Sequence, residues 1–265
     1  MLAALSMYDW PELRSETDRF WSALRDHLRA SGLDAPDELE RFRDAEDVWA
    51  DGNLLITQTC GYPLVTGLCG PARLVATPCY NTDGCKGAAY SSWIITQRSS
   101  GMERIEDTFG GRVAINARHS QSGYSALRYV LAPHYAGGPL YDQVVESGGH
   151  RNSLALVADG DADICSVDAV CWAYAARFDP AIVEKLQAIA QTPMTPGLPF
   201  ITGSLQSDRT IEVLRDGLQK TLKSGQFAEP NSLQLADIET LPIDAYDRIR
   251  QMEEDAISRG YAEIV

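Results

Sequence analysis

The chain has 265 residues, 45% of them hydrophobic and 23% charged, which is the composition of a globular protein with one large or two smaller domains. Its 23 basic and 37 acidic side chains give a formal net charge of −14, which opposes binding to nucleic acid and anionic lipid. No apolar run approaches the roughly 20 residues of a membrane span. We therefore expect a folded chain with no nucleic-acid partner and no membrane span.

The six cysteines and four histidines are too few and too scattered to predict a disulfide scaffold or a metal site, and we expect neither a metal nor a cofactor. Cys79 and Cys85 flank a polar turn, which permits a loop disulfide; two free thiols are the alternative. Residues 1–8 lack the basic and long apolar regions of a signal peptide, and they predict a first strand.

In chain order, helical patterns then alternate with short apolar runs. Pro11 begins an amphipathic helix that ends near Gly32. Later helices are predicted at residues 62–69, 123–131, 153–159, 169–177, 208–224 and 243–258. Buried strands are predicted at residues 54–56, 74–76, 92–95, 112–115 and 164–167. This alternation predicts an α/β fold with mostly parallel sheets flanked by helices.

Two segments have the features of crossovers between lobes. One is the strand around Trp93, and the other is the proline-rich run 191–199, which fits neither regular element. We therefore predict a discontinuous first lobe of residues 1–91 and 191–265, a second lobe of residues 92–190, and a ligand cleft between them.

A polar turn after the strand 112–115 is the first candidate binding element. It contains Ser120, Gln121, Ser122 and Gly123 and leads directly into a helix. The first amides of a helix lack intrahelical acceptors and carry the positive end of its dipole, so they favour an anion. The serines can add hydroxyl donors, and the glycine permits close approach of a ligand. A serine that only caps the helix is the alternative explanation.

Two further strand ends carry candidate residues. His150 begins a helix after a Ser-Gly-Gly turn and could donate to an anionic oxygen. Asp168 follows the strand 164–167 and could accept from a ligand amine or hydroxyl. Helix capping again explains each residue without a ligand. Because the carboxyl ends of neighbouring parallel strands share one edge, we expect these residues to face the same crevice.

The ordered set of these motifs resembles the phosphonate-binding (PhnD-like) substrate-binding proteins of ABC transporters. The likeness extends over residues 1–205 and includes the start of the first strand, the serine turn, the turn before His150 and the run from Gly160 to Asp168. It implies the type 2 periplasmic binding fold, with two lobes that close on a ligand about a hinge.

The resemblance also implies which residues bind. The serine turn and His150 would hold the phosphonate oxygens, and Asp168 would be the acidic partner of a ligand amine. Tyrosines of the cleft correspond to Tyr62 and Tyr90, and Tyr8 is a further candidate by position. Where aminophosphonate binders carry another acidic residue, this chain has Pro-Gly-Leu-Pro-Phe at residues 196–200, so recognition of an amino group does not carry over.

These observations favour a non-catalytic protein that captures a small oxyanion, phosphonate-like or phosphate-like, and presents it to an ABC permease. Its location would be periplasmic if an export signal has been removed from the chain, and cytoplasmic otherwise. The alternative is a cytosolic enzyme on the same fold, similar to menaquinone-pathway dehydratases or thiamine-precursor synthases. Its chemistry would then depend on His150, Asp168 and a nucleophilic Cys60 or Cys165.

Overall fold

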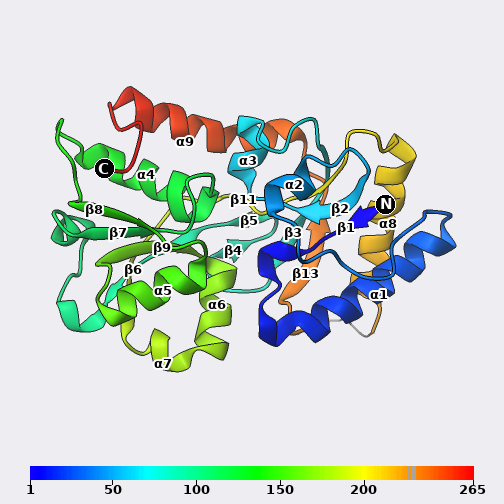
Figure 1. Ribbon diagram of the computed structural model, residues 1–265, viewed down its shortest axis with the longest axis horizontal. Coiled ribbons are helices and arrows are strands. Elements are labelled where there is room, and N and C mark those ends of the chain that lie inside the picture. The colour runs from blue at the N-terminus through cyan, green and yellow to red at the C-terminus, as the bar shows by residue number, and fades with distance from the viewer. Residues whose placement is uncertain (226, 228–230) are drawn as a thin grey trace. The chain divides into compact units, whose positions relative to one another are not determined.

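The computed structural model describes residues 1–225, 227 and 231–265, and the chain divides into two compact units (Figure 1). Unit 1 comprises Met1–Asn81, Lys86–Ala88 and Pro196–Ala245. Unit 2 comprises Thr82–Cys85, Ala89–Thr195 and Tyr246–Val265. Each unit is an α/β body with its own five-stranded sheet, as the alternation of helical and strand patterns predicted.

The sheet of unit 1 has the order β1-β2-β12-β3-β13. Its strands are β1 (Leu2–Ala3), β2 (Leu54–Gln58), β12 (Phe200–Thr202), β3 (Arg73–Tyr80) and β13 (Leu235–Glu239). Its helices are α1 (Arg14–Ala30), α2 (Ala45–Trp49), α3 (Gly61–Thr66) and α8 (Asp208–Lys223). The apolar stripe of α1 meets that of α8 in the main core, through the fully buried Leu24, Leu28, Leu214 and Leu218.

The sheet of unit 2 has the order β10-β6-β9-β7-β8. Its strands are β10 (Leu186–Gln191), β6 (Ser92–Gln97), β9 (Ile164–Asp168), β7 (Arg112–Ile115) and β8 (Gln143–Glu146). In Figure 1, α4 (Ala126–Leu131) and α9 (Asp247–Ser258) lie on one side of β7, β8 and β9, and α5 (His150–Asp159) lies on the other. The remaining helices of this unit are α6 (Ala169–Phe178) and α7 (Pro180–Val183).

A third sheet has the order β11-β5-β4 and is made of two-residue strands: β11 (Thr195–Pro196), β5 (Ala89–Tyr90) and β4 (Cys85–Lys86). The expectation of mostly parallel sheets is corrected, because both five-stranded sheets are mixed. β12 runs antiparallel to β2 and to β3, and β6 runs antiparallel to β9 and to β10. Short apolar runs mark a buried strand but do not encode its direction.

The C-terminal segment also differs from the sequence-based division, which placed residues 191–265 together in the first lobe. Residues Tyr246–Val265 belong to unit 2. Ala256, Tyr261 and Ile264 are buried in its core cluster, with side chains of β7, α4 and β9. The predicted helix 243–258 therefore packs through one face. It consists of a short 3-10 helix, Ile243–Tyr246, followed by α9.

Local differences affect two candidate residues. The first strand ends at Ala3, and Tyr8 lies in a short 3-10 turn, Ser6–Tyr8, rather than at a strand end. The helix predicted from residue 123 begins as a π-helical turn, Gln121–Ser125, that continues into α4. The helix α5 begins at His150, as expected for the residue after the Ser-Gly-Gly turn, and thus three residues before the apolar pattern 153–159.

A buried arginine joins the C-terminal segment to α4. Arg128 donates to the Ala262 carbonyl at 2.6 Å and to Glu253 Oε1 at 3.1 Å, and its guanidinium lies 5.3 Å from the centroid of the Tyr124 ring. Its side chain is 4% exposed, so its charge depends on these protein partners rather than on water.

We predict that Arg128→Met lowers the free energy of unfolding by about 3 kcal/mol, because it leaves Glu253 and a backbone carbonyl without their buried partner. The control is Arg118→Met, which removes an exposed ion pair with Glu263 at 3.5 Å and should cost less than about 0.5 kcal/mol. Urea denaturation measures both values. Equal losses in the two variants would contradict the role given to Arg128.

Candidate functional site

Three strand ends of unit 2 carry the candidate site. β7 pairs in parallel with both β8 and β9, so the carboxyl ends of the three strands share one edge of the sheet. The serine turn follows β7, the turn leading to His150 follows β8, and Asp168 is the last residue of β9. The topology therefore brings together residues that are up to 48 positions apart in the chain, from Ser120 to Asp168.

The serine turn is held by hydrogen bonds at both ends of one peptide unit. The N–H of Gly123 donates to Ser120 Oγ at 3.1 Å, which is the N-cap bond of the turn. The carbonyl of Ser122, in the same peptide unit, accepts from Ser166 Oγ at 2.7 Å. All of these groups are buried, since Ser120 and Ser122 are 2% exposed and Ser166 is 1% exposed. The orientation of this peptide is therefore fixed by protein groups.

Gly123 occupies a space that no side chain could share. A Cβ at this position would lie 2.0 Å from Asn116 Oδ1 and 3.1 Å from His150 Cε1. The glycine predicted to permit close approach of a ligand thus also lets α5 and the end of β7 approach the turn.

The imidazole of His150 lies against the serine turn. Its Nε2 is 2.8 Å from Ser122 Oγ and 3.5 Å from Asp168 Oδ2, and the side chain is 9% exposed. Burial lowers the pKa of His150 from its usual 6.5, while the Asp168 carboxylate and a hydrogen bond to the Ser166 backbone act in the opposite direction. The ring is therefore neutral at pH 7, and it contributes a hydrogen bond rather than a charge.

Both oxygens of the Asp168 side chain face protein groups. Oδ1 accepts from the Cys171 N–H at 2.8 Å as the N-cap of α6, and Oδ2 is the oxygen near His150. The side chain is 3% exposed. The capping role considered from the sequence is thus present, together with a contact to the imidazole.

Several buried polar atoms in and beside the turn have no hydrogen-bond partner among the residues that the structure describes. They are both side-chain ends of Gln121, Ser125 Oγ, Asn116 Oδ1 and His150 Nδ1. Buried polar groups are normally paired with protein, solvent or ligand. Such a group of unpaired atoms around one turn is typical of a binding site whose ligand supplies the missing partners.

The candidate tyrosines are distributed over both units. Tyr90 is in β5 of unit 2 and is 3% exposed. Tyr8 belongs to unit 1, where its ring packs edge-on against Tyr80 with centroids 5.2 Å apart, and Tyr62 begins α3 of the same unit. Within unit 2, the structure therefore brings His150 and Asp168 to the serine turn.

Sequence reasoning missed Asn116 and Ser166. Asn116 directly follows β7, and Ser166 lies two residues before Asp168 in β9, so its side chain emerges on the same face of the strand. A polar residue inside the otherwise apolar run 164–167 was the one available signal for Ser166.

The geometry gives little support to the catalytic alternative. Ser122 and Asp168 both approach Nε2 of His150, whereas in a catalytic triad the serine oxygen and the orienting carboxylate face opposite nitrogens of the imidazole. Cys165 is fully buried, and burial raises the pKa of its thiol, so it is not a thiolate at neutral pH. Cys79 and Cys85 are not joined in a disulfide, which agrees with the second of the two alternatives considered from the sequence.

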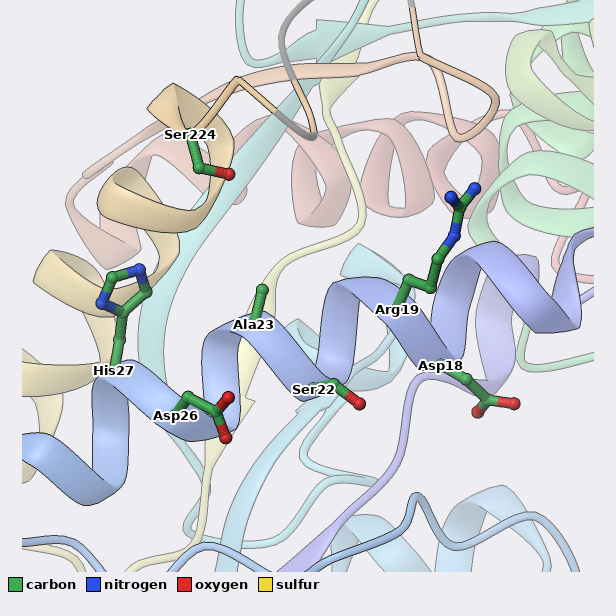
Figure 2. A pocket seen from close by; sticks show the side chains of 7 residues that line it. All are labelled: Asp18, Arg19, Ser22, Ala23, Asp26, His27 and Ser224. Carbon is green, nitrogen blue, oxygen red and sulfur yellow. The ribbon is translucent and has the colours of Figure 1, made fainter.

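A separate surface hollow of about 490 Å³ lies on unit 1 (Figure 2). Its charged groups already have partners, since Asp18 pairs with Arg41, Asp26 with Arg25 and Arg19 with Glu16. It is lined mainly by one face of α1, through Asp18, Arg19, Ser22, Ala23, Asp26 and His27, with Ser224 from the end of α8. This hollow lacks the unpaired buried groups of the serine turn. Within the described part of the chain, no three His, Cys, Asp or Glu side chains are grouped to hold a metal ion.

The two α/β units, each with a mixed five-stranded sheet, define the class of two-lobed periplasmic binding proteins. The profile of one family, described as ABC transporter, phosphonate, periplasmic substrate-binding protein, matches residues 13–241. The chain belongs to this family, which confirms the resemblance and the fold predicted from the sequence. The family binds a solute for a transporter, which supports a non-catalytic role with a small ligand and a permease as partners.

Solved structures agree with this fold. PhnD1 from Prochlorococcus marinus, in complex with methylphosphonate, has a TM-score of 0.77 at 14% identity, with 97% of this chain and 98% of that chain covered. A binding protein component of an ABC phosphonate transporter from Pseudomonas aeruginosa has a TM-score of 0.74 at 16% identity, with 98% and 87% covered. No curated protein gives a significant match. Among the described residues, no helix has the length and apolar composition that crossing a bilayer requires.

We predict that Gly123→Ala destabilises unit 2 by about 1 to 3 kcal/mol, because the new methyl group displaces Asn116. Adding Asn116→Ala should recover part of this loss by making room. Gly149→Ala is the control, since a Cβ there meets no atom within 4 Å and its φ of −177° suits any residue. Thermal and urea denaturation measure the losses, and equal losses at the two glycines would contradict the crowding.

The lowered pKa of His150 predicts a pH effect on stability. Below about 6.5 the unfolded chain takes up a proton at this residue before the folded chain does, so the free energy of unfolding decreases as the pH falls. His150→Gln lacks this contribution. The difference in stability between wild type and variant should therefore change, in favour of the variant, between pH 7.5 and 5.5. A constant difference in urea denaturation would contradict a neutral buried imidazole.

Proposed function

We propose that this chain is the solute-binding protein of an ABC transporter and that its ligand is a small phosphonate-like or phosphate-like oxyanion. The serine turn, with Ser120, Gln121, Ser122 and Gly123, and His150 hold the oxyanion in unit 2. Tyr90 of the same unit and Tyr8 and Tyr62 of unit 1 complete the contacts. The family is periplasmic, and the proposal places this chain there.

The proposal rests on the hydrogen bonds that Ser120 Oγ and Ser122 Oγ make within the protein. Ser120 Oγ accepts from the Gly123 N–H, so its hydroxyl proton is available to a further acceptor, and Ser122 Oγ, 2.8 Å from His150 Nε2, also keeps its proton when that nitrogen is the donor. The unpaired amide of Gln121 supplies another donor beside them. Several donors around one buried turn fit the oxygens of a tetrahedral oxyanion.

Hydrogen bonds to a charged ligand are strong enough for this role. Each contributes on the order of 1.5 to 3 kcal/mol, so four or five give micromolar affinity, about −8 kcal/mol, after the costs of association. Neutral donors also avoid binding the ligand too tightly for release to a permease.

Titration calorimetry with methylphosphonate, phosphate, phosphite and sulfate tests the proposal. We expect stoichiometric binding of at least one phosphorus oxyanion, no chemical change of the ligand by phosphorus NMR, and a roughly tenfold or larger loss of affinity in Ser120→Ala. The matched control is Ser207→Ala, because Ser207 caps α8 with the same 3.1 Å bond to the N–H three residues on. Both variants should lose about 1 kcal/mol of stability, since each removes an N-cap.

Turnover of the ligand would instead favour the enzyme interpretation. Equal affinity in Ser120→Ala and Ser207→Ala would remove the serine turn from the binding site. The double variant Ser122→Ala/His150→Ala should have no measurable affinity while remaining folded by circular dichroism.

A further inference from the structure

We propose that Ser166 and Asp168 on β9 are positioning residues that make the serine turn a donor site and do not themselves contact the ligand. This inference rests on the proposed oxyanion-binding function and assigns Asp168 a role other than the recognition of a ligand amine. The two residues alternate along β9, so both side chains emerge on the same face at the carboxyl end of the strand.

The role of Ser166 follows from the peptide unit that it holds. Its hydroxyl donates to the Ser122 carbonyl at 2.7 Å, on the opposite edge of the peptide from the Gly123 N–H, which donates to Ser120 Oγ. A free carbonyl in an anion site would place a partial negative charge near the ligand oxygens. Because Ser166 donates a hydrogen bond to this carbonyl, the carbonyl oxygen does not face the ligand oxygens.

The role of Asp168 follows from the surroundings of His150 Nε2. Nε2 faces Ser122 Oγ at 2.8 Å and Asp168 Oδ2 at 3.5 Å, and a carboxylate can only accept. Nε2 must therefore carry the ring proton. The opposite nitrogen, Nδ1, is buried without an acceptor among the described residues, so an N–H there would be unsatisfied.

This tautomer determines the direction of the next hydrogen bond. Because Nε2–H donates to Ser122 Oγ, the serine oxygen serves as the acceptor, and its own proton is available to a ligand or to Ser120 Oγ at 3.5 Å. Asp168 thus keeps the proton on Nε2, the nitrogen that Ser122 also faces, and Ser122 is left as a hydroxyl donor. With the opposite tautomer, Ser122 would donate to the ring and offer the ligand only lone pairs.

Asp168 is poorly suited to a ligand amine for the same reason. Oδ1 caps α6 through Cys171, Oδ2 faces the imidazole, and the side chain is 3% exposed. We therefore expect no preference for an aminophosphonate over methylphosphonate that depends on this carboxylate.

The first test measures the tautomer in the ligand-free protein. A long-range proton–nitrogen NMR spectrum at pH 7.5, assigned with His150→Gln, should show His150 protonated at Nε2. Asp168→Asn keeps the cap of α6, because asparagine is an equally good N-cap, but it presents an amide donor to Nε2 and should shift the proton to Nδ1. A wild-type imidazole protonated at Nδ1, or an unchanged tautomer in Asp168→Asn, would overturn the proposal.

The second test measures affinity by calorimetry with methylphosphonate and 2-aminoethylphosphonate. Asp168→Asn should weaken both ligands by the same factor, roughly tenfold or more, because it removes one donor that both share. Ser166→Ala should weaken both similarly, and Ser166→Thr should restore affinity by restoring the hydroxyl. The matched control is Thr202→Val in unit 1, which removes a buried hydroxyl that donates to the Leu55 carbonyl at 2.7 Å and should leave affinity unchanged.

Two results in this second test would overturn the proposal. One is a selective loss of 2-aminoethylphosphonate binding in Asp168→Asn, which would make Asp168 a ligand contact. The other is unchanged affinity in Ser166→Ala. If wild type binds neither these phosphonates nor phosphate or phosphite, the proposed function is wrong, whereas the tautomer, measured without ligand, still decides the positioning roles.

Discussion

The orientation of one peptide unit, Ser122–Gly123, is the constraint on which the candidate site depends. Its carbonyl is held by β9 and its N–H by the side chain of Ser120, so neither end of the unit can rotate without breaking a buried hydrogen bond. A buried polar group without a partner costs about 1 to 3 kcal/mol, which makes either rotation expensive. The site is therefore preorganised, and a ligand does not have to order the turn when it binds.

The packing of unit 2 supports the same turn from its other side. The C-terminal helix α9 contacts the turn Gln121–Ser125 and α4, and Tyr124 of the turn is part of the core cluster that also contains Ala256 and Tyr261. Arg128 then ties α4 to the backbone of the last residues. The final twenty residues thus help to stabilise a turn that lies more than a hundred positions earlier in the chain.

The sequence predicted the parts of this site that are encoded locally. A serine-rich turn between a buried strand and a helix, and a histidine at a helix start, can be read from a few adjacent residues. The contacts between them depend on strand order, which places β7 between β8 and β9, and short apolar runs do not specify order or direction. For the same reason the roles of Ser166 and Asn116 were not predicted, although Ser166 lies within a recognisable strand and Asn116 directly follows one. The place of residues 246–265 depends on which of two cores buries Ala256 and Tyr261, and amphipathic periodicity alone cannot distinguish between them.

A chain with a net charge of −14 is at first sight an unfavourable receptor for an anion. At physiological ionic strength, however, the field of exposed charges is screened over about 8 Å, whereas buried donors act on a bound ligand at hydrogen-bond distance and with little screening. The structure places hydroxyls, amides and a neutral imidazole at the turn, and the one carboxylate there, Asp168, faces the imidazole and caps α6. Under the proposed function, the neutral donors attract an oxyanion through fixed dipoles, and the acidic surface reduces nonspecific association with other anions. Affinity at the site and repulsion at the surface are therefore compatible. Together they favour a small ligand, because a small ligand is buried among the donors of the site and is no longer near the exposed acidic side chains.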